Sequence, residues 1–263
     1  MVSGGNPNLV PEKANTLVAG FVYQPSFVDG LSLSADWYKL DISDSISSLG
    51  AQRIVNDCFS GASPQLCSQV NRNAEGLLGR VFNTFLNVAQ YRLRGIDYEA
   101  SYQTETNFFD NMEESINIRA LAGYQAVNMD VPYGATTGTD VSGTVDNPDL
   151  TGNVSITYNL GPYSAQVQQR YIAGGIINPN FIEGVDVDDN TVESYQTTNL
   201  RLGYNAETQT GATWSLGFNI TNLLDEAPPR IAGFELQGGN NQVVHNNYDW
   251  MGRRYQVSFN MNF

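Results

Sequence analysis

Apolar and polar residues alternate along most of this chain with a period of two. Between residues 213 and 222, Trp214, Leu216, Phe218 and Ile220 alternate with Ser215, Gly217, Asn219 and Thr221. Successive side chains of a strand point to opposite faces of a sheet, so the pattern predicts strands with one apolar and one polar face. About nine such strands are predicted, at 16–24, 31–43, a segment ending near 103, 115–125, 148–160, 163–173, 194–204, 213–222 and 255–263.

The connections between the predicted strands alternate between short and long. The long ones are 44–79, 129–147, 174–193 and 223–247, and only the first contains a helix signal, near 52–58. Outer-membrane β-barrels show this alternation because their periplasmic turns are short and their extracellular loops are long. Aromatic residues near the strand ends suit the girdles at the two membrane interfaces of such barrels. They are Tyr23, Trp37, Tyr158, Tyr163, Tyr204 and Trp214.

Composition indicates which face of these strands meets lipid. Charged residues make up 15% of the 263 residues, and the mean hydropathy is -0.29. No run approaches the roughly 18 apolar residues that a transmembrane helix needs. A soluble β-barrel would carry many Lys and Glu on its polar face, whereas here that face is mostly Ser, Thr, Asn, Gln and Gly. The apolar face is therefore expected to face lipid, with Asp97, Glu99, Arg170 and Arg201 in the lumen.

The charge balance bears on partners and metals. The formal net charge is -14, which argues against a nucleic-acid partner because such binding needs a basic surface. Glu183, Asp186, Asp188 and Asp189 cluster in one long connection and could offer oxygen ligands to calcium. Their spacing matches no EF-hand loop, so a solvated acidic loop is the preferred interpretation. The sequence predicts no metal site and no cofactor.

Cysteine and histidine residues offer few chemical alternatives. Cys58 and Cys67 lie close together in a polar segment, and in an oxidising compartment they would form a disulfide, whereas two free thiols are the other possibility. The sole histidine, His245, lies far from both in sequence, which disfavours a zinc site. An outer-membrane hydrolase would need a nucleophile and a base, but no G-x-S-x-G motif is present and His245 has no recognisable partner. We therefore expect no catalytic residues and no enzyme.

Four motifs give the chain a family resemblance. NPNLVPEKANT at 6–16, RGIDY at 94–98, NITNLLD at 219–225 and YDWMGRRY at 248–255 occur in order and span nearly the whole chain. Each resembles a segment of the C-terminal β-barrel of TonB-dependent outer-membrane receptors. The resemblance implies an all-β fold, an antiparallel transmembrane barrel segment that forms part of a 22-stranded barrel. Residues 1–263 would be the C-terminal part of that barrel, without the plug domain.

The resemblance also implies a function and partners. Such receptors sit in the outer membrane and import a bulky nutrient of the siderophore, cobalamin or saccharide type. Implied partners are outer-membrane lipid, an unknown extracellular small molecule, and the barrel-assembly machinery, which would recognise the last strand through Tyr255 and Phe263. The TonB complex would engage only the N-terminal plug. The residues that contact the ligand cannot be assigned from the sequence.

The start of the chain carries no recognisable targeting signal. Residues 1–5 lack both a basic start and an apolar segment. Counting strands backward from the last one places the first strand in the middle of a barrel, so we expect an upstream portion to be missing. The alternative is a small self-contained outer-membrane barrel that acts as a pore or a structural protein.

Overall fold

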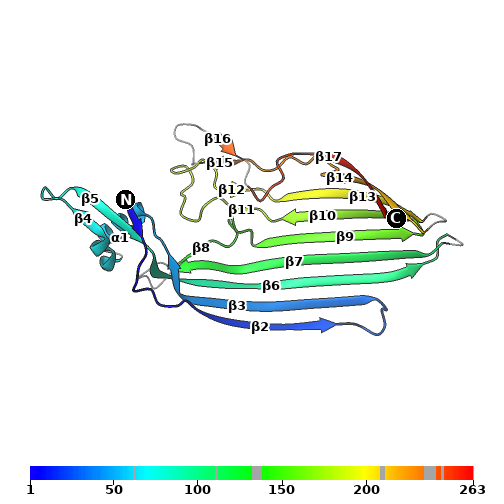
Figure 1. Ribbon diagram of the computed structural model, residues 1–263, viewed down its shortest axis with the longest axis horizontal. Coiled ribbons are helices and arrows are strands. Elements are labelled where there is room, and N and C mark those ends of the chain that lie inside the picture. The colour runs from blue at the N-terminus through cyan, green and yellow to red at the C-terminus, as the bar shows by residue number, and fades with distance from the viewer. Residues whose placement is uncertain are drawn as a thin grey trace. The chain divides into compact units, whose positions relative to one another are not determined.

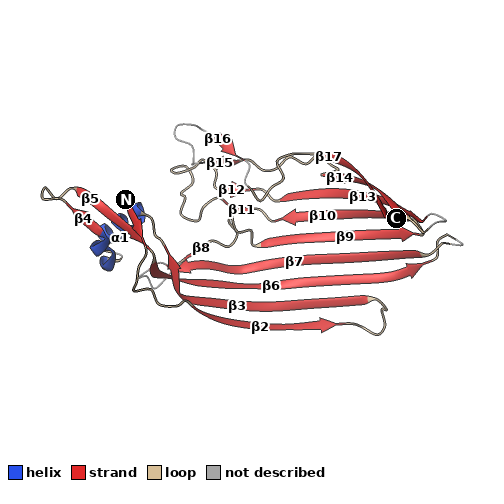
Figure 2. Cartoon of the chain, in the orientation of Figure 1, coloured by secondary structure: helices blue, strands red, loops and turns tan. Residues whose placement is uncertain are grey.

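The computed structural model describes residues 1–61, 63–109, 112–131, 138–207, 211–233, 241–243 and 246–262. Within these residues the fold is all-β and mostly antiparallel, with one α-helix and one 3-10 helix (Figure 2). Neither helix combines the length and apolar character needed to cross a membrane. The helices are α1 (Ala51–Ser60) and η1 (Pro64–Gln69).

A 10-stranded sheet dominates the described structure (Figure 1). Its strands follow the order β2-β3-β6-β7-β9-β10-β13-β14-β17, and β8 pairs with β7 off this path. Consecutive strands of the sheet are neighbours, as the alternating turns and loops of the sequence predict. The strands are β2 (Lys13–Tyr23), β3 (Leu31–Ser47), β6 (Leu86–Thr106), β7 (Glu114–Val131), β8 (Thr139–Asp140), β9 (Leu150–Leu160), β10 (Tyr163–Ile172), β13 (Tyr195–Glu207), β14 (Thr213–Thr221) and β17 (Arg254–Asn262).

The remaining strands form small sheets within the loops. One sheet has the order β1-β5-β4, and two further pairs are β11-β12 and β15-β16. Their bounds are β1 (Val2–Gly4), β4 (Val70–Arg72), β5 (Leu78–Thr84), β11 (Gly175–Ile176), β12 (Thr191–Val192), β15 (Ile231–Gly233) and β16 (Asn241–Val243).

The chain divides into two compact units, and β2, β3, β6 and β7 contribute residues to both. The first unit consists of Met1–Val18, Tyr38–Arg94 and Ala126–Ser142. It holds the two helices and the sheet of β1, β4 and β5. The second unit is Ala19–Trp37, Gly95–Gln125 and Gly143–Phe263. It holds β9 to β17 and the remaining parts of the four shared strands.

Strand register in the second unit follows the predicted period of two. Val167 of β10 pairs with Ile156 of β9 and with Leu200 of β13. The next residue, Gln168, pairs with Ser155 and Asn199. Apolar residues therefore form rows on one face and polar residues form rows on the other, which is the arrangement of a sheet between lipid and an aqueous lumen.

Aromatic side chains form a continuous row across the turn ends of the last strands. The ring centroids of Tyr163 and Tyr204 lie 5.0 Å apart, and those of Tyr204 and Trp214 lie 5.2 Å apart. Trp214 continues the row to Phe259 at 6.2 Å. All four rings lie on the apolar face, and aromatic residues at such positions are typical of a membrane interface.

The structure corrects the sequence prediction near Phe85. A single strand was expected to follow the long connection 44–79 and to run to about residue 103, but the ladder is interrupted at Phe85, and β5 and β6 belong to different sheets. β5 instead pairs with β4, and its other edge pairs in parallel with β1, where Val2 lies opposite Phe82. Local alternation cannot reveal such a parallel pair, because the two strands are far apart in sequence.

The described main sheet has two free edges, at β2 and β17, and does not close on itself. Antiparallel pairing extends without interruption from β7 to β17. The observed sheet is thus an open part of a barrel wall.

Candidate functional site

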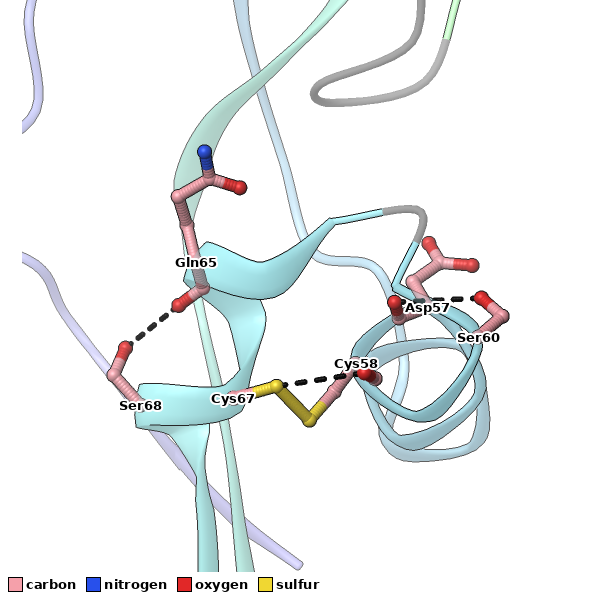
Figure 3. The surroundings of a disulfide bond; sticks show 6 residues. All are labelled: Asp57, Cys58, Ser60, Gln65, Cys67 and Ser68. Atoms are coloured by element: carbon pink, nitrogen blue, oxygen red, sulfur yellow. Dashed lines mark hydrogen bonds between the residues drawn. A yellow bond between two sulfur atoms is a disulfide. The ribbon is translucent and has the colours of Figure 1, made fainter.

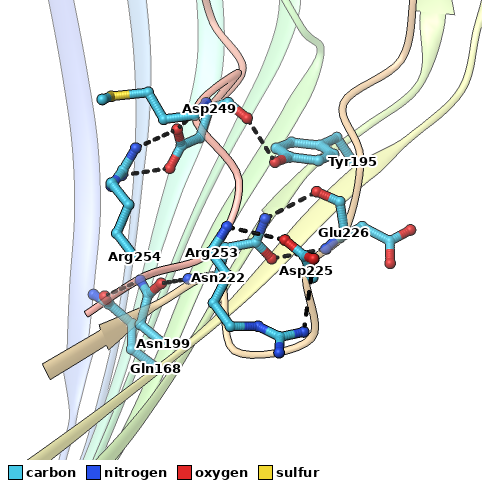
Figure 4. A network of polar contacts seen from close by, with 10 residues as sticks. Gln168, Tyr195, Asn199, Asn222, Asp225, Glu226, Asp249, Arg253 and Arg254 are labelled. Carbon is cyan, nitrogen blue, oxygen red and sulfur yellow. Dashed lines mark hydrogen bonds and ion pairs between the residues drawn. The ribbon is translucent and has the colours of Figure 1, made fainter.

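Asn222 at the end of β14 organises the loop that leads to β17 (Figure 4). Its side chain is fully buried and its φ of 54° lies in the left-handed region, which asparagine tolerates better than most residues. The side-chain amide donates to the Glu226 carbonyl and accepts from the Glu226 N–H, at 2.9 Å each. The Asn222 N–H donates to Oδ1 of Asn199 at 2.9 Å. The side chain at this position of the motif 219–225 thus both donates and accepts, as an amide can.

Asp225 connects the start of this loop to its end. Its Oδ1 accepts a hydrogen bond from the backbone N–H of Arg253 at 3.0 Å, and its Oδ2 lies 3.9 Å from the Arg253 guanidinium. Arg253 follows Gly252, whose φ of 70° favours glycine. Thr221 and Arg254 then pair in register between β14 and β17. The two sequence motifs at 219–225 and 248–255 therefore meet at the base of one loop.

Asp249 and Arg254 form a two-pronged ion pair within the same loop base (Figure 4). The two guanidinium nitrogens of Arg254 donate to Oδ1 and Oδ2 of Asp249 at 2.8 and 2.6 Å. The hydrogen bonds from Arg254 lower the pKa of Asp249 below its ordinary value, against a smaller opposing effect of burial. The Tyr195 hydroxyl donates to the Asp249 carbonyl at 3.2 Å. Asp249 is thereby kept ionised and fixed in position.

A small apolar cluster supports this loop base. The rings of Tyr195 and Tyr248 meet edge to face, with centroids 5.3 Å apart, and both side chains are buried. Burial raises the pKa of Tyr248, so this tyrosine stays protonated at neutral pH. The other buried members of the cluster are Val145, Ile172, Val192 and Ile231.

A pocket of about 810 Å³ lies between this loop base and the polar face of the sheet. Its volume is within the range of small-molecule sites. Arg170 and Asp97, both predicted to face the lumen, contribute opposite charges to its wall, and Oδ1 of Asn153 is a buried acceptor with no hydrogen-bond partner among the described residues. The residues whose polar side chains line the pocket are Asp97, Asp146, Thr151, Asn153, Arg170, Asn246, Asn247, Tyr248 and Asp249.

The sequence identified parts of this pocket without identifying the pocket. Alternation placed Asp97 and Arg170 on the lumen face, and Tyr248 begins the motif at 248–255. The structure brings these three together, although they come from three distant segments. Asn153 was missed, because one asparagine among many on a polar face carries no distinguishing signal in a single sequence. Trp250, from the same motif as Tyr248, is 72% exposed and does not line the pocket.

Cys58 at the end of α1 and Cys67 in η1 form a disulfide (Figure 3). The bond joins two short helices that each bury a single apolar side chain, Ile54 in α1 and Leu66 in η1. The disulfide lies in the first unit and the pocket lies in the second. The cross-link therefore holds a loop structure with little core of its own.

The other positions singled out in the sequence lie in the last strand and in the long loops. Tyr255 lies in β17 with its side chain 63% exposed on the apolar face, whereas Phe263 and His245 lie outside the described residues. Three of the four clustered acidic residues, Glu183, Asp186 and Asp189, accept hydrogen bonds within the third long loop. Asp186 accepts from the Ile182 N–H, and Asp189 accepts from the N–H and hydroxyl of Thr191.

Comparison with known proteins identifies the family. The family model described as "TonB dependent receptor-like, beta-barrel" matches residues 1–223. The chain belongs to this family, whose members are β-barrel receptors of the Gram-negative outer membrane. It is accordingly an outer-membrane protein.

Individual relatives agree with this assignment. The heme/hemopexin utilization protein C of Haemophilus influenzae strain Rd is 26% identical over 247 residues, which cover 90% of this chain and 30% of the relative. The siderophore receptor PirA from Acinetobacter baumannii has a TM-score of 0.58 at 19% identity, over 98% of this chain and 32% of that structure. A ferric enterobactin receptor variant from Pseudomonas aeruginosa has a TM-score of 0.59 at 18% identity, over 98% and 32%. The chain therefore spans about a third of the length of these proteins.

Proposed function

We propose that this chain is the C-terminal part of the barrel of a receptor that imports a bulky nutrient across the outer membrane. Residues 1–263 would form one barrel domain, with a plug domain supplied by other sequence. The observation that carries the proposal is the polar pocket on the inner face of a sheet whose outer face is apolar. Such a receptor is a transporter and not an enzyme.

The open sheet supports a larger barrel. In lipid, unpaired backbone groups at a strand edge are costly, so the edges at β2 and β17 require further strands. A barrel of 22 strands, the size described for plugged outer-membrane transporters, would supply them. Short turns such as Gly161–Pro162 would then face the periplasm, and the long loops that bear the pocket would face the exterior.

An iron chelate is the ligand class that the relatives favour. The curated relative is named for heme and hemopexin utilization, and the similar structures include siderophore receptors. We infer that Arg170, Asn153 and Tyr248 offer a cation, an amide and a ring edge to such a ligand. Energy coupling would come from the TonB complex acting on the plug, and insertion would depend on the barrel-assembly machinery reading the last strand.

Growth under iron limitation tests the proposal. A strain that lacks the gene should lose growth on one of the supplied sources, heme or a panel of ferric siderophores, and the complete gene product should restore it. The variant Arg170→Ala should restore growth poorly, whereas Arg80→Ala, in an exposed strand of the first unit, should restore it fully. Growth on every iron source without the gene, combined with normal expression of the protein in wild type, would refute iron uptake.

The self-contained pore makes a different prediction. It requires these 263 residues alone to yield a folded barrel whose electrophoretic mobility changes on heating. We expect no such heat-modifiable species, because the sheet ends at two unpaired edges. Detection of a stable heat-modifiable monomer would favour the pore over the receptor.

A further inference from the structure

A second hollow lies on the polar face of the main sheet, nearer to the short turns than the pocket at the loop base. Its volume is about 220 Å³, and it is lined by residues of β9, β10, β13, β14 and β17, all in the second unit. Arg201 supplies the only charge in its described wall. The sequence pattern placed Arg201 in the lumen, but the pocket at the loop base does not include this residue.

A pair of glycines keeps this hollow open. Ser164, Gly203, Gly217 and Ser258 lie opposite one another in a single row across β10, β13, β14 and β17. A Cβ atom at Gly203 would collide with Oγ of Ser164, and a Cβ atom at Gly217 would collide with Oγ of Ser258. Backbone is therefore uncovered beside Arg201, where larger side chains would fill the space.

The guanidinium of Arg201 is available to a ligand. The residue is exposed, and among the described residues its side chain takes part in no ion pair and no hydrogen bond. Its cross-strand neighbour Gln166 is already engaged, because it donates to Oγ1 of Thr157 at 3.0 Å. The N–H donors of Arg201 are thus left for water or for a bound anion.

Carboxylates are nearly absent from the strands that form this wall. The whole chain has 27 Asp and Glu residues against 13 Lys and Arg residues. Among the residues of β9, β10, β13, β14 and β17, however, the only carboxylate is Glu207, at the last position of β13. A concave wall that carries positive charge without negative charge raises the local concentration of anions.

Register places Arg201 on the same strip of polar side chains as Arg170 in the pocket at the loop base. Arg170 pairs with Thr197, which lies four positions before Arg201 on β13. At the usual rise of a strand, this is roughly 13 Å along the sheet. Between the two arginines, Asn199 donates to Oε1 of Gln168 at 3.1 Å. A ligand that leaves the pocket toward the short turns would meet uncharged amides and then a second guanidinium.

We propose that the hollow around Arg201 is a second binding subsite, which receives a carboxylate of an anionic ligand after the ligand leaves the pocket at the loop base. The inference rests on the proposed function, and it narrows the ligand class to chelates that carry net negative charge and free carboxylates. A guanidinium binds a carboxylate through two parallel charge-assisted hydrogen bonds. The uncovered backbone at Gly203 and Gly217 gives the ligand room for this approach. A single exposed cation binds weakly, as passage requires.

Protection of arginine side chains from phenylglyoxal tests the subsite in the complete gene product, with citrate as the carboxylate probe. Phenylglyoxal modifies accessible guanidinium groups, and peptide mass spectrometry gives the labelling rate of each arginine. Arg201 should be labelled, and about 10 mM citrate should slow its labelling about fivefold, which corresponds to a Kd of about 2.5 mM. Glycerol at the same concentration, or sodium chloride of equal ionic strength, should not slow it.

Two other arginines serve as controls within the same sample. Arg119 belongs to the same unit, but its guanidinium lies 2.8 Å from Oε1 of Glu99 and already has a carboxylate partner. Arg80 is exposed on β5 in the first unit. Citrate should leave the labelling rates of both unchanged, because neither combines an unpaired guanidinium with the hollow.

Three outcomes would overturn the subsite. Absence of labelling at Arg201 would show that another part of the receptor, such as the plug, covers this residue. Labelling that citrate does not slow would show that the hollow does not bind carboxylates. Equal protection of Arg201 and Arg80 would show a general effect of charge.

The growth experiment above has a separate readout, so the two proposals can fail independently. Protection of Arg201 by citrate, without growth on any supplied iron source, would refute iron uptake and leave the anion subsite standing. Growth that depends on the gene, without protection of Arg201, would overturn only the present inference.

Discussion

The loop between β3 and β5 is fastened by a covalent bond, whereas the loop between β14 and β17 is fastened by amides, carboxylates and guanidinium groups. The first uses the Cys58–Cys67 disulfide between two short helices. The second uses Asn222, the Asp225–Arg253 contact and the Asp249–Arg254 ion pair. Both loops leave the main sheet, and each solves the same problem of ordering a long segment.

The difference follows from what each loop can bury. The helical loop has little apolar core, so a cross-link that restricts the unfolded loop is an effective source of order. The last loop rests on the cluster of Tyr195 and Tyr248, and partly buried polar groups there strengthen one another. Reductant, but not acid, should therefore destabilise the first loop. Acid, but not reductant, should destabilise the second loop.

The largest effect is expected at Asn222. Replacement Asn222→Ala removes the amide that serves Glu226 and places alanine in a left-handed conformation, so the free energy of unfolding should fall by about 3 kcal/mol. Urea unfolding of the complete gene product in lipid vesicles, followed by tryptophan fluorescence, measures this change. Asn222→Gly relieves the backbone strain and should lose about 1 kcal/mol less. A loss below about 0.5 kcal/mol in both variants would show that the buried amide is dispensable.

Removal of the disulfide should have the next largest effect, and only locally. The cross-link spans a sequence separation of 9, and the chain-entropy model assigns such a loop about 2–3 kcal/mol. Cys58→Ser/Cys67→Ser should make the segment 51–69 sensitive to limited proteolysis while the unfolding midpoint of the barrel stays unchanged. Reductant should reproduce this in wild type and add nothing in the variant. Equal protection of the reduced and oxidised loops would contradict the assigned role.

A smaller effect is expected from Asp249→Asn, because the ion pair is partly exposed, with side-chain exposures of 22% and 37%. We expect a loss of about 1 kcal/mol at neutral pH after solvent screening is considered. Arg254 lowers the pKa of Asp249 in the folded state, so the stabilisation is fully present above the ordinary aspartate pKa. It is lost as the pH falls through the lower folded pKa. When the free energy of unfolding is measured as a function of pH, this acid-dependent loss should be absent from Asp249→Asn. A pH dependence equal to that of wild type would argue against a stabilising role for the ion pair.

The smallest effect is expected from Arg53→Ala in α1. Its guanidinium lies 3.5 Å from Asp57 at i,i+4, and its side chain is 40% exposed. Such pairs contribute roughly 0.3–0.5 kcal/mol and are screened by salt. The rate of loop cleavage by protease should increase only slightly in Arg53→Ala. High salt should abolish this difference from wild type. A loss comparable to that of the disulfide variant would mean that the loop depends on ion pairs as the last loop does.

The alternation of apolar and polar residues was sufficient to predict the faces of the lipid-facing strands. The alternation in 163–173 and 194–204 predicts which side chains share a face, and Val167 and Leu200 indeed pair. It was insufficient for the segment near Phe85, where one predicted strand is divided between two sheets. Both halves have strand-forming residues, and only contacts with distant β1 and β4 separate them.

The site was predictable only in pieces. Asp97 and Arg170 could be assigned to the lumen because each alternates with apolar neighbours. That they line one pocket with Asn153 and Tyr248 depends on strand register and on the path of the last loop. The motifs at 219–225 and 248–255 were visible as family signatures, but the contact between Asp225 and Arg253 was not.

The sequence by itself determined most strands of the main sheet and their apolar faces, because side-chain alternation is a property of the local backbone, and its motifs indicated the family. The tertiary structure decided which residues from different strands meet. It placed Asn222 and Asp225 against the end of their own loop, and it joined β1 to β5 in parallel. The physical reason is that contacts across long loops depend on register and burial, which no short window of sequence contains.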